Sequence, residues 1–307
     1  MRKVWITLTS AMRLALATLT LAACAPAHAG PLSFSDLLAR PRPKADAHIA
    51  FGPGPRQFGE LWLPAGKGPH PVVVLIHGGC WQAALPGTEL VDFLANDLRR
   101  RGIAVWNIDY ARLGDANGGY PDTFLDAGRG VDYLRVLART HDLDLSHVVA
   151  VGHSAGGHLA VWAAGRKTLN PKSPLHTADP LPIQAVVSLA GINDLAAYRA
   201  RGPDACGGLG TIDALVGAGH RHVTDLYADT SPSQMVPTGV KQYIVSGALD
   251  PIVPHAFGEA YAAKAKAAGD PAQAITIPGA GHFELIDPMS AAWKQIVAVI
   301  EREARGR

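Results

Sequence analysis

The run Val72-Val-Val-Leu-Ile76 is the sequence feature that most limits what this chain can fold into. Its residues are all apolar and mostly β-branched, without the polar residue at every second position that a half-exposed strand shows. Such a run is typical of a strand buried on both faces. Strands of this kind occur in parallel sheets whose two faces are covered by helices, so the run favours an α/β fold.

The rest of the chain repeats this pattern from Glu60 onward. Further strands are expected at 103–108, 148–151, 184–189, 242–246 and 274–277, and helices at 86–101, 120–139, 155–164, 255–268 and 288–303. Alternating strands and helices predict a mainly parallel central sheet with helices on both faces. Crossovers in such sheets are right-handed, and ligands bind at the carboxyl ends of the strands.

The first 29 residues are expected to be a signal peptide. Basic residues precede an apolar run at 14–23, which is too short to span a membrane. Ala27-His-Ala29 fits cleavage before Gly30, whereas Leu21-Ala-Ala-Cys24 resembles a lipobox in which Cys24 would carry a lipid anchor. Either alternative predicts an exported protein, periplasmic or secreted, and no later segment is long and apolar enough for a membrane span.

Composition excludes some classes of partner. The net charge is only +2, and the sequence contains no run of Lys and Arg with interleaved aromatic residues. Nucleic-acid binding is therefore not expected. No Cys and His spacing is typical of zinc, and His220-x-His222 is expected at the surface, so we expect neither a metal nor an organic cofactor. The sequence leaves open the oligomeric state, and whether Cys80 and Cys206 form a disulfide or remain free thiols.

The central motif is Gly152-His-Ser154-Ala-Gly156, directly after an expected strand and directly before an expected helix. A serine hydroxyl is a weak nucleophile that needs a neighbouring base, and a sharp strand-to-helix turn exposes it to one. Flanking glycines permit such a turn. The motif therefore predicts that Ser154 is a catalytic nucleophile, with a Gly-rich turn lacking chemistry as the alternative.

A second motif, His77-Gly78-Gly79-Cys80-Trp81, follows the strand at 72–76. Hydrolysis of an ester or amide passes through an oxyanion that needs N–H donors placed in advance. Glycines allow the backbone to approach the substrate closely. We expect one donor to be the N–H of Ala155 and the other that of Gly79 or Cys80.

The acid and the base should follow the serine in that order. Asp250 comes after the strand at 242–246, and His282 comes after the strand at 274–277. His282 can act as general base toward Ser154, and Asp250 can hold its tautomer. Asp194, which also follows a strand, is the alternative acid.

Other polar residues near these motifs have simpler expected roles. His77 should orient its loop, and His153 should line the pocket as a substrate-binding residue. His158, one turn into the helix, is expected to pack. Glu284 and Asp287 are expected to make local hydrogen bonds or to be solvated.

Together these segments resemble the α/β-hydrolase superfamily over nearly all of residues 50 to 305. The two motifs resemble its esterase branch, which includes hormone-sensitive-lipase-like esterases, feruloyl-esterase-like enzymes and kynurenine formamidases. Trp81 is closer to the formamidase pattern and is expected to bind substrate, whereas Cys80 departs from both patterns. The resemblance implies an α/β-hydrolase fold with a cap-like insertion at about 193–237.

The expected organisation is a signal peptide at 1–29, an extended Pro- and Gly-rich arm at 30–57 and a hydrolase domain at 58–307. The expected function is that of a serine hydrolase that cleaves small carboxylic esters through an acyl-enzyme. The alternatives are an arylformamidase-like amide hydrolase and a non-catalytic binding protein on the same fold. Acyl and alcohol specificity do not follow from the sequence.

Overall fold

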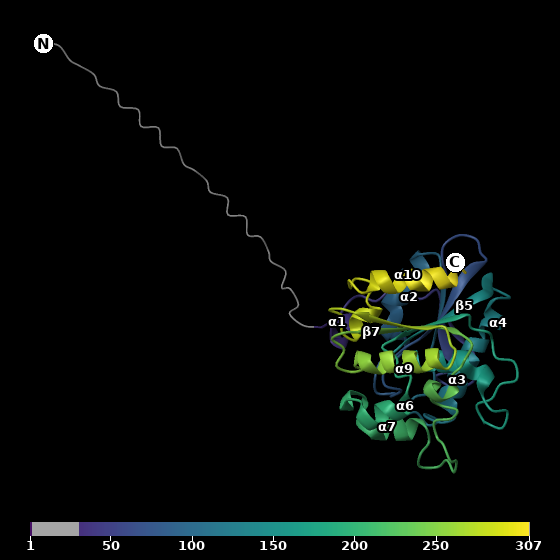
Figure 1. Ribbon diagram of the computed structural model, residues 1–307. Coiled ribbons are helices and arrows are strands. Elements are labelled where there is room, and N and C mark those ends of the chain that lie inside the picture. The colour runs from purple at the N-terminus through teal and green to yellow at the C-terminus, as the bar shows by residue number, and fades with distance from the viewer. Residues whose placement is uncertain (2–30, 307) are drawn as a thin grey trace. The chain divides into compact units, whose positions relative to one another are not determined.

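The computed structural model describes Met1 and residues 31–306 (Figure 1). The signal peptide expected at 1–29 therefore lies, apart from its first residue, outside the described residues, as does Cys24. The described helices include none that is both long enough and apolar enough to cross a membrane.

The described part of the chain contains one eight-stranded sheet with the strand order β1-β2-β4-β3-β5-β6-β7-β8. The strands are β1 (Ala47–Ala50), β2 (Phe58–Trp62), β3 (His70–Ile76), β4 (Ala104–Ile108), β5 (Leu143–His153), β6 (Ala185–Leu189), β7 (Lys241–Gly247) and β8 (Ala272–Ile277). The pairs β1–β2 and β2–β4 are antiparallel, and the other neighbours are parallel. The predicted mainly parallel sheet is confirmed, and each of the six expected strands is present.

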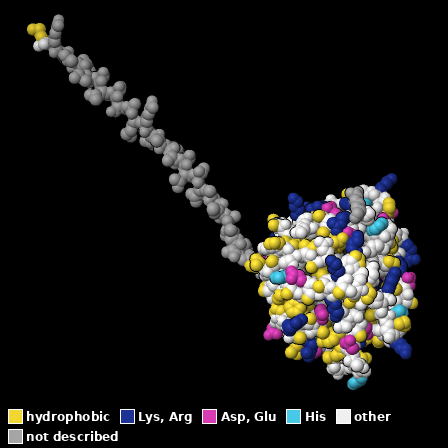
Figure 2. Space-filling view, in the orientation of Figure 1, with side chains coloured by type: hydrophobic (Ala, Val, Ile, Leu, Met, Phe, Trp, Pro, Cys, Tyr) yellow, Lys and Arg dark blue, Asp and Glu magenta, His cyan; other side chains and the backbone are white. Residues whose placement is uncertain are grey.

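Helices cover both faces of this sheet, as predicted. Figure 1 shows α10 and α2 above the sheet and α3 and α9 below it. The helices are α1 (Phe34–Leu38), η1 (Thr88–Val91), α2 (Asp92–Arg100), α3 (Asp122–Asp132), α4 (Leu134–Leu137), α5 (Ala155–Ala164), η2 (Gly165–Thr168), α6 (Leu195–Arg201), η3 (Asp204–Cys206), α7 (Gly208–Leu215), α8 (Pro232–Met235), α9 (His255–Ala267), η4 (Phe283–Ile286) and α10 (Trp293–Ala304), where η marks a 3₁₀ helix. Charged side chains of both signs are interspersed on the face shown in Figure 2.

The segment expected to be an extended arm differs from that expectation. It contains the helix α1 and the strand β1, which pairs with β2 and so belongs to the same sheet as the domain expected to start at residue 58. The strand has only four residues, and its side chains alternate between half-buried and exposed. An edge strand this short has no long apolar run, so the sequence pattern did not predict it.

Residues 193–237, expected to form an insertion, contain α6, η3, α7 and α8 between β6 and β7. These helices are short, so their stability depends on packing against the rest of the protein rather than on helix propensity. Buried side chains at Leu195, Tyr198, Ile212 and Leu215 supply that packing.

Close backbone packing explains the glycines around residue 154. A Cβ atom at Gly152 would lie 2.1 Å from the carbonyl oxygen of Gly156, and one at Gly156 would lie 2.1 Å from that of Ile76. A Cβ at Gly157 would lie 2.7 Å from the Cα of Gly191. The glycines therefore let the first turn of α5 touch both β3 and the segment after β6.

The replacement Gly156→Ala should lower the free energy of unfolding by about 1–3 kcal/mol or more, because the new methyl group would overlap backbone that cannot easily move. The replacement Gly210→Ala is the matched control. Gly210 is exposed within α7, and a Cβ there would meet no atom within 4 Å. Urea unfolding followed by circular dichroism should show a loss only for Gly156→Ala; equal midpoints for the two variants would contradict this packing.

Candidate active site

The parallel register brings the ends of the central strands to one edge of the sheet. Ile76 at the end of β3 lies beside Gly152 of β5, and Gly247 at the end of β7 lies beside Ile277 of β8. The segments that follow these strands therefore emerge side by side. They are the segments that carry the predicted oxyanion loop, Ser154, Asp250 and His282.

Ser154 occupies a strained turn between β5 and α5. Its backbone has φ 55° and ψ −120°, a conformation that residues other than glycine rarely adopt. Its N–H donates to the carbonyl oxygen of Leu189 at 2.8 Å, which ties the turn to the end of β6. The side chain is thereby presented at the top of the sheet, as the sequence motif predicts.

His282 and Asp250 are hydrogen-bonded to each other. The distance from His282 Nδ1 to Asp250 Oδ2 is 2.6 Å, and both residues are buried. The other oxygen of Asp250, Oδ1, accepts from the N–H groups of Ile252 and Val253 at 2.8 and 2.9 Å. These bonds fix the carboxylate, which accepts a hydrogen bond from the protonated Nδ1 of His282. Nε2 of His282 is therefore the nitrogen that can accept a proton.

The loop after β3 has an unusual backbone. Gly79, Cys80 and Trp81 are consecutive residues with positive φ, at 98°, 51° and 55°. Such a backbone is not extended, and turns of successive N–H groups can form a concave site for an anion. Across from it, Ala155 is the first residue of α5, where backbone N–H groups have no partner within the helix.

The side chain of His77 holds this loop in place through hydrogen bonds. It is fully buried, with Nδ1 2.7 Å from the carbonyl oxygen of Gly78 and Nε2 3.0 Å from Asp109 Oδ1. Burial acts to raise the pKa of Asp109, but the hydrogen bond and charge of His77 and the charge of Arg112 hold it below its ordinary value. The expected role of His77 in orienting the loop agrees with these contacts.

His153 connects the turn at Ser154 to the histidine loop, the segment 278–283 after β8 that carries His282. Its Nε2 lies 3.1 Å from the carbonyl oxygen of His282, so Nε2 carries the proton and donates it. Burial, followed by the charge of His282, lowers the pKa of His153 well below its ordinary value of 6.5. A neutral His153 can therefore hold the backbone of His282 over a wide range of pH.

Ser154, His153 and His282 line a pocket of about 380 Å³ together with part of the loop after β3. Its lining is mostly apolar and includes Gly79, Cys80, His153, Ser154 and His282, together with Ser33, Phe34, Leu85, Leu90, Ala205, Ile252 and Phe283. Sequence reasoning missed Ser33 and Phe34, which come from the supposed arm, and Ile252. No local pattern marks them, because they reach the pocket only through the packing of distant segments.

Trp81 is a correction to the expected set. We expected it to bind substrate, but its side chain is completely buried and its ring packs edge-on against His158, with 5.3 Å between the ring centroids. It is not among the residues that line the pocket, and its indole lies instead against His158 of α5. Trp81 therefore contributes to the core.

The rival residues make structural contacts. Asp194 is the N-cap of α6, where its side chain accepts from the N–H of Ala197 at 3.0 Å. His158 is buried and bonded to the carbonyl oxygen of Thr230, and Asp287 pairs with Arg40 at 3.1 Å. These contacts leave Asp250 as the acid that is bonded to His282.

A disulfide joins the loop after β3 to the insertion. It links Cys80 to Cys206, which are 126 positions apart in the sequence, and this answers the question that the sequence left open. Gln82 reinforces the junction, since its Nε2 donates to the carbonyl oxygen of Cys206 at 3.1 Å. The neighbouring Ala205 lines the pocket, so the disulfide holds part of the insertion against it.

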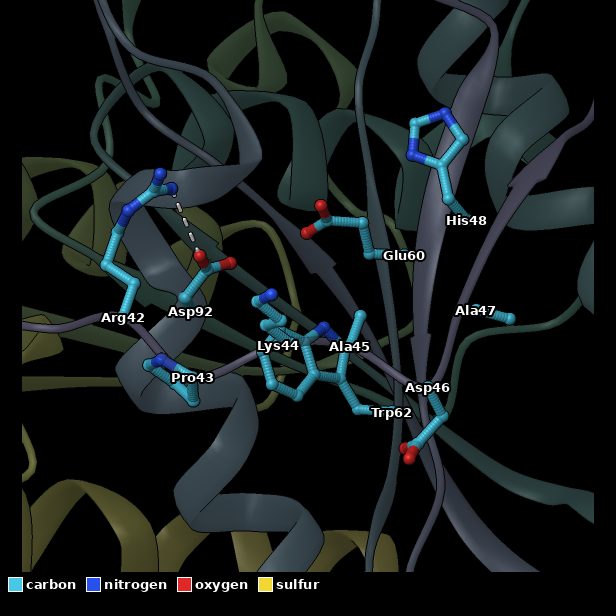
Figure 3. Close-up of a pocket in the computed structure, with 10 residues that line it drawn as sticks. All are labelled: Arg42, Pro43, Lys44, Ala45, Asp46, Ala47, His48, Glu60, Trp62 and Asp92. Atoms are coloured by element: carbon cyan, nitrogen blue, oxygen red, sulfur yellow. Dashed lines mark hydrogen bonds and ion pairs between the residues drawn. The ribbon is translucent and has the colours of Figure 1, made fainter.

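A second hollow, of about 390 Å³, lies between residues 42–48, β2 and the start of α2 (Figure 3). Figure 3 shows the carboxyl groups of Glu60 and Asp92 turned toward each other there. Burial and the charge of Glu60 raise the pKa of Asp92 to about 7, against the opposing charge of Arg42. None of the predicted site residues lines this hollow. The two hollows have similar volumes, but only the one beside Ser154 contains the predicted catalytic groups.

No group of three or more His, Cys, Asp or Glu side chains among the described residues is arranged to hold a metal ion. His220 and His222 are exposed, as expected.

Comparisons with known proteins agree with this fold. The family model described as BD-FAE matches residues 60–264. Esterase B from Lactobacillus rhamnosis is similar in structure, with a TM-score of 0.74 and 18% sequence identity, over 88% of this chain and 89% of that one. A truncated carbohydrate esterase from gut microbiota has a TM-score of 0.69 and 21% identity, over 86% and 97% of the two chains. No curated protein sequence matches this chain.

Removal of the disulfide by Cys80→Ser with Cys206→Ser should lower the free energy of unfolding by up to about 5 kcal/mol, since the bond closes a long loop. Thermal unfolding with and without a phosphine reductant measures this. The reductant should lower the midpoint of the wild type toward that of the double variant and leave the double variant unchanged. Equal midpoints for the oxidised wild type and the double variant would contradict a stabilising role.

Asp92 should make stability depend on pH. Its ordinary pKa of 3.8 applies to the unfolded chain, and its pKa of about 7 to the folded one. Between these values the folded protein keeps a proton that the unfolded chain has lost, so its contribution lowers the free energy of unfolding as pH rises from about 4 to 7. The replacement Asp92→Asn should therefore stabilise the protein more at pH 8 than at pH 4.

Urea unfolding of both proteins at several pH values measures this difference. Asp46→Asn is the control, because Asp46 lines the same hollow but is exposed and bonded to Arg99. A difference between Asp92→Asn and wild type that does not change with pH would refute the assignment.

Proposed function

The chain belongs to the BD-FAE family, and from that premise we propose that it hydrolyses carboxylic esters, with Ser154 as nucleophile. The observation that carries the proposal is the hydrogen bond between His282 and Asp250 beside a pocket that Ser154 also lines. The names of the similar structures, which are called esterases, support the same activity.

In the proposed first step, Nε2 of His282 takes the proton of Ser154 as the hydroxyl oxygen attacks the ester carbonyl carbon. The carbonyl oxygen becomes an oxyanion, for which the N–H of Ala155 and that of Gly79 or Cys80 are the proposed donors. When the tetrahedral intermediate collapses, His282 gives the proton to the departing alcohol. Ser154 is left as an acyl ester.

In the proposed second step, His282 takes a proton from water, which attacks the acyl-enzyme. The carboxylic acid leaves, and the proton returns to Ser154. Throughout, Asp250 accepts the hydrogen bond from Nδ1 of His282 and stabilises the imidazolium that forms, and the hydrogen bond from His153 holds the backbone of the same loop. The scheme uses no metal and no organic cofactor.

The proposed substrate is a small ester whose apolar part enters the pocket. Aliphatic and aromatic side chains dominate the lining, which supports burial of an uncharged group. The formamidase alternative rests on the likeness of the motif around Trp81 to the formamidase pattern, and comparing turnover of N-formylkynurenine with that of a simple acetyl ester tests it.

We also propose that the protein is exported to the periplasm or secreted. The disulfide between Cys80 and Cys206 supports this proposal, because disulfides persist in oxidising compartments. Mass spectrometry of the mature N-terminus distinguishes cleavage before Gly30 from lipidation at Cys24, and an unprocessed Met1 in the mature protein would refute export by either route.

The replacement Ser154→Ala should reduce hydrolysis of p-nitrophenyl acetate by at least about 10³-fold, because the nucleophile is lost. Asp250→Asn should reduce kcat by about 10³- to 10⁴-fold, because an amide cannot hold the required tautomer of His282. Steady-state kinetics measures both effects, and labelling by a fluorophosphonate should be lost in Ser154→Ala.

The matched control is Asp194→Asn, which replaces the rival carboxylate at the N-cap of α6 and should leave kcat within about threefold of wild type. Circular dichroism checks that each variant folds. A wild-type protein that neither hydrolyses esters nor reacts with the fluorophosphonate would refute the proposal and favour a binding protein on the same fold.

A further inference from the structure

We propose that Phe34, on the segment 31–40 ahead of the sheet, limits the size of the apolar group that the pocket accepts. The inference rests on the proposed esterase function for the identity of the ligand. It assigns a specificity role to a segment that, from its sequence, is expected to be an extended arm.

Phe34 lies at the pocket through an aromatic contact with the histidine loop. Phe34 and Ser33 line the same pocket as Ser154 and His282. The ring of Phe34 lies 6.1 Å from that of Phe283, centroid to centroid, and Phe283 in turn lies 5.1 Å from the ring of His282. The phenyl group of Phe34 therefore forms a wall close to the reacting groups.

The helix that carries Phe34 is held by its own cap and by the protein beneath it. Ser33 and Asp36 form a capping box at the start of α1. Leu37 is almost completely buried. A helix of five residues would not persist alone, so these contacts are what keep Phe34 in place.

The end of the segment is fixed as well. Arg40 pairs with Asp287 at 3.1 Å, and its guanidinium lies 4.5 Å from the centroid of the Phe93 ring. The segment is thereby attached at its far end both to the region after η4 and to α2.

Glu284 couples the start of the segment to the catalytic loop. One oxygen of its carboxylate accepts from the N–H of Leu32, and the other accepts from the N–H of Gly281 at 3.0 Å. Gly281 directly precedes His282. One carboxylate thus joins the segment that bears Phe34 to the loop that bears the proposed base.

The remainder of the lining defines what Phe34 would exclude. Leu85, Leu90 and Ile252 are aliphatic, and no Asp, Glu, Lys or Arg is among the described residues that surround the pocket. The pocket thus favours an uncharged apolar group, and a bulky phenyl ring on one wall limits how long that group can be. A smaller side chain at position 34 would lengthen the available space.

The test compares Phe34→Ala and Phe34→Trp with wild type on p-nitrophenyl acetate and p-nitrophenyl octanoate. The ratio of kcat/KM for octanoate to that for acetate should rise about tenfold or more in Phe34→Ala and fall in Phe34→Trp. The matched control is Leu38→Ala, on the same helix but away from the pocket lining, and it should leave the ratio unchanged. Thermal unfolding checks that all three variants fold.

A second measurement separates this inference from the proposed function. In the Ser154→Ala background, calorimetry with the uncharged amides octanamide and butyramide measures binding without turnover, and Phe34→Ala should strengthen octanamide binding relative to butyramide. An unchanged preference in both experiments would overturn the role of Phe34, as would an equal change in Leu38→Ala. Absence of hydrolysis by the wild type would refute the proposed function alone, and the binding experiment would still decide the role of Phe34.

Discussion

The parallel pairing of β3 with β5 is the constraint on which the site depends. Because Ile76 lies beside Gly152, the loop after β3 and the turn after β5 emerge next to each other. A shift of one residue in this register would move each side chain of β3 to a different place between the two helix layers, which a close-packed core tolerates poorly. Val72–Ile76 are completely buried, so hydrophobic burial opposes that shift and holds the proposed oxyanion donors opposite Ser154.

Conformations that are unfavourable by themselves cluster at this edge of the sheet. Ser154, Cys80 and Trp81 all have positive φ, which costs a residue with a side chain about 1–3 kcal/mol. Neighbouring contacts offset the strain. The glycines at 152 and 156 allow close backbone packing, the indole of Trp81 is buried, and Leu189 accepts the N–H of Ser154. The strained residues are thereby kept in the geometry proposed for catalysis.

Two walls of the pocket come from segments outside the sheet, the insertion after β6 and the segment ahead of β1. The disulfide at Cys80 holds the insertion after β6 against the site, and Glu284 holds the N-terminal segment there. The disulfide ends in the proposed oxyanion loop, at Cys80. The bonds of Glu284 end at Gly281, directly before the proposed base His282. The pocket and the proposed catalytic groups are therefore one connected structure.

The sequence by itself determined the central strands, the sheet type and the candidate catalytic groups, because each depends on local patterns. A buried strand needs an apolar run, and a serine turn needs its glycines. Only the tertiary structure decided which side chains form the pocket. It buried Trp81, joined Cys80 to Cys206 and brought Phe34 to the site. These outcomes depend on contacts between residues distant in the chain, for which no local pattern exists.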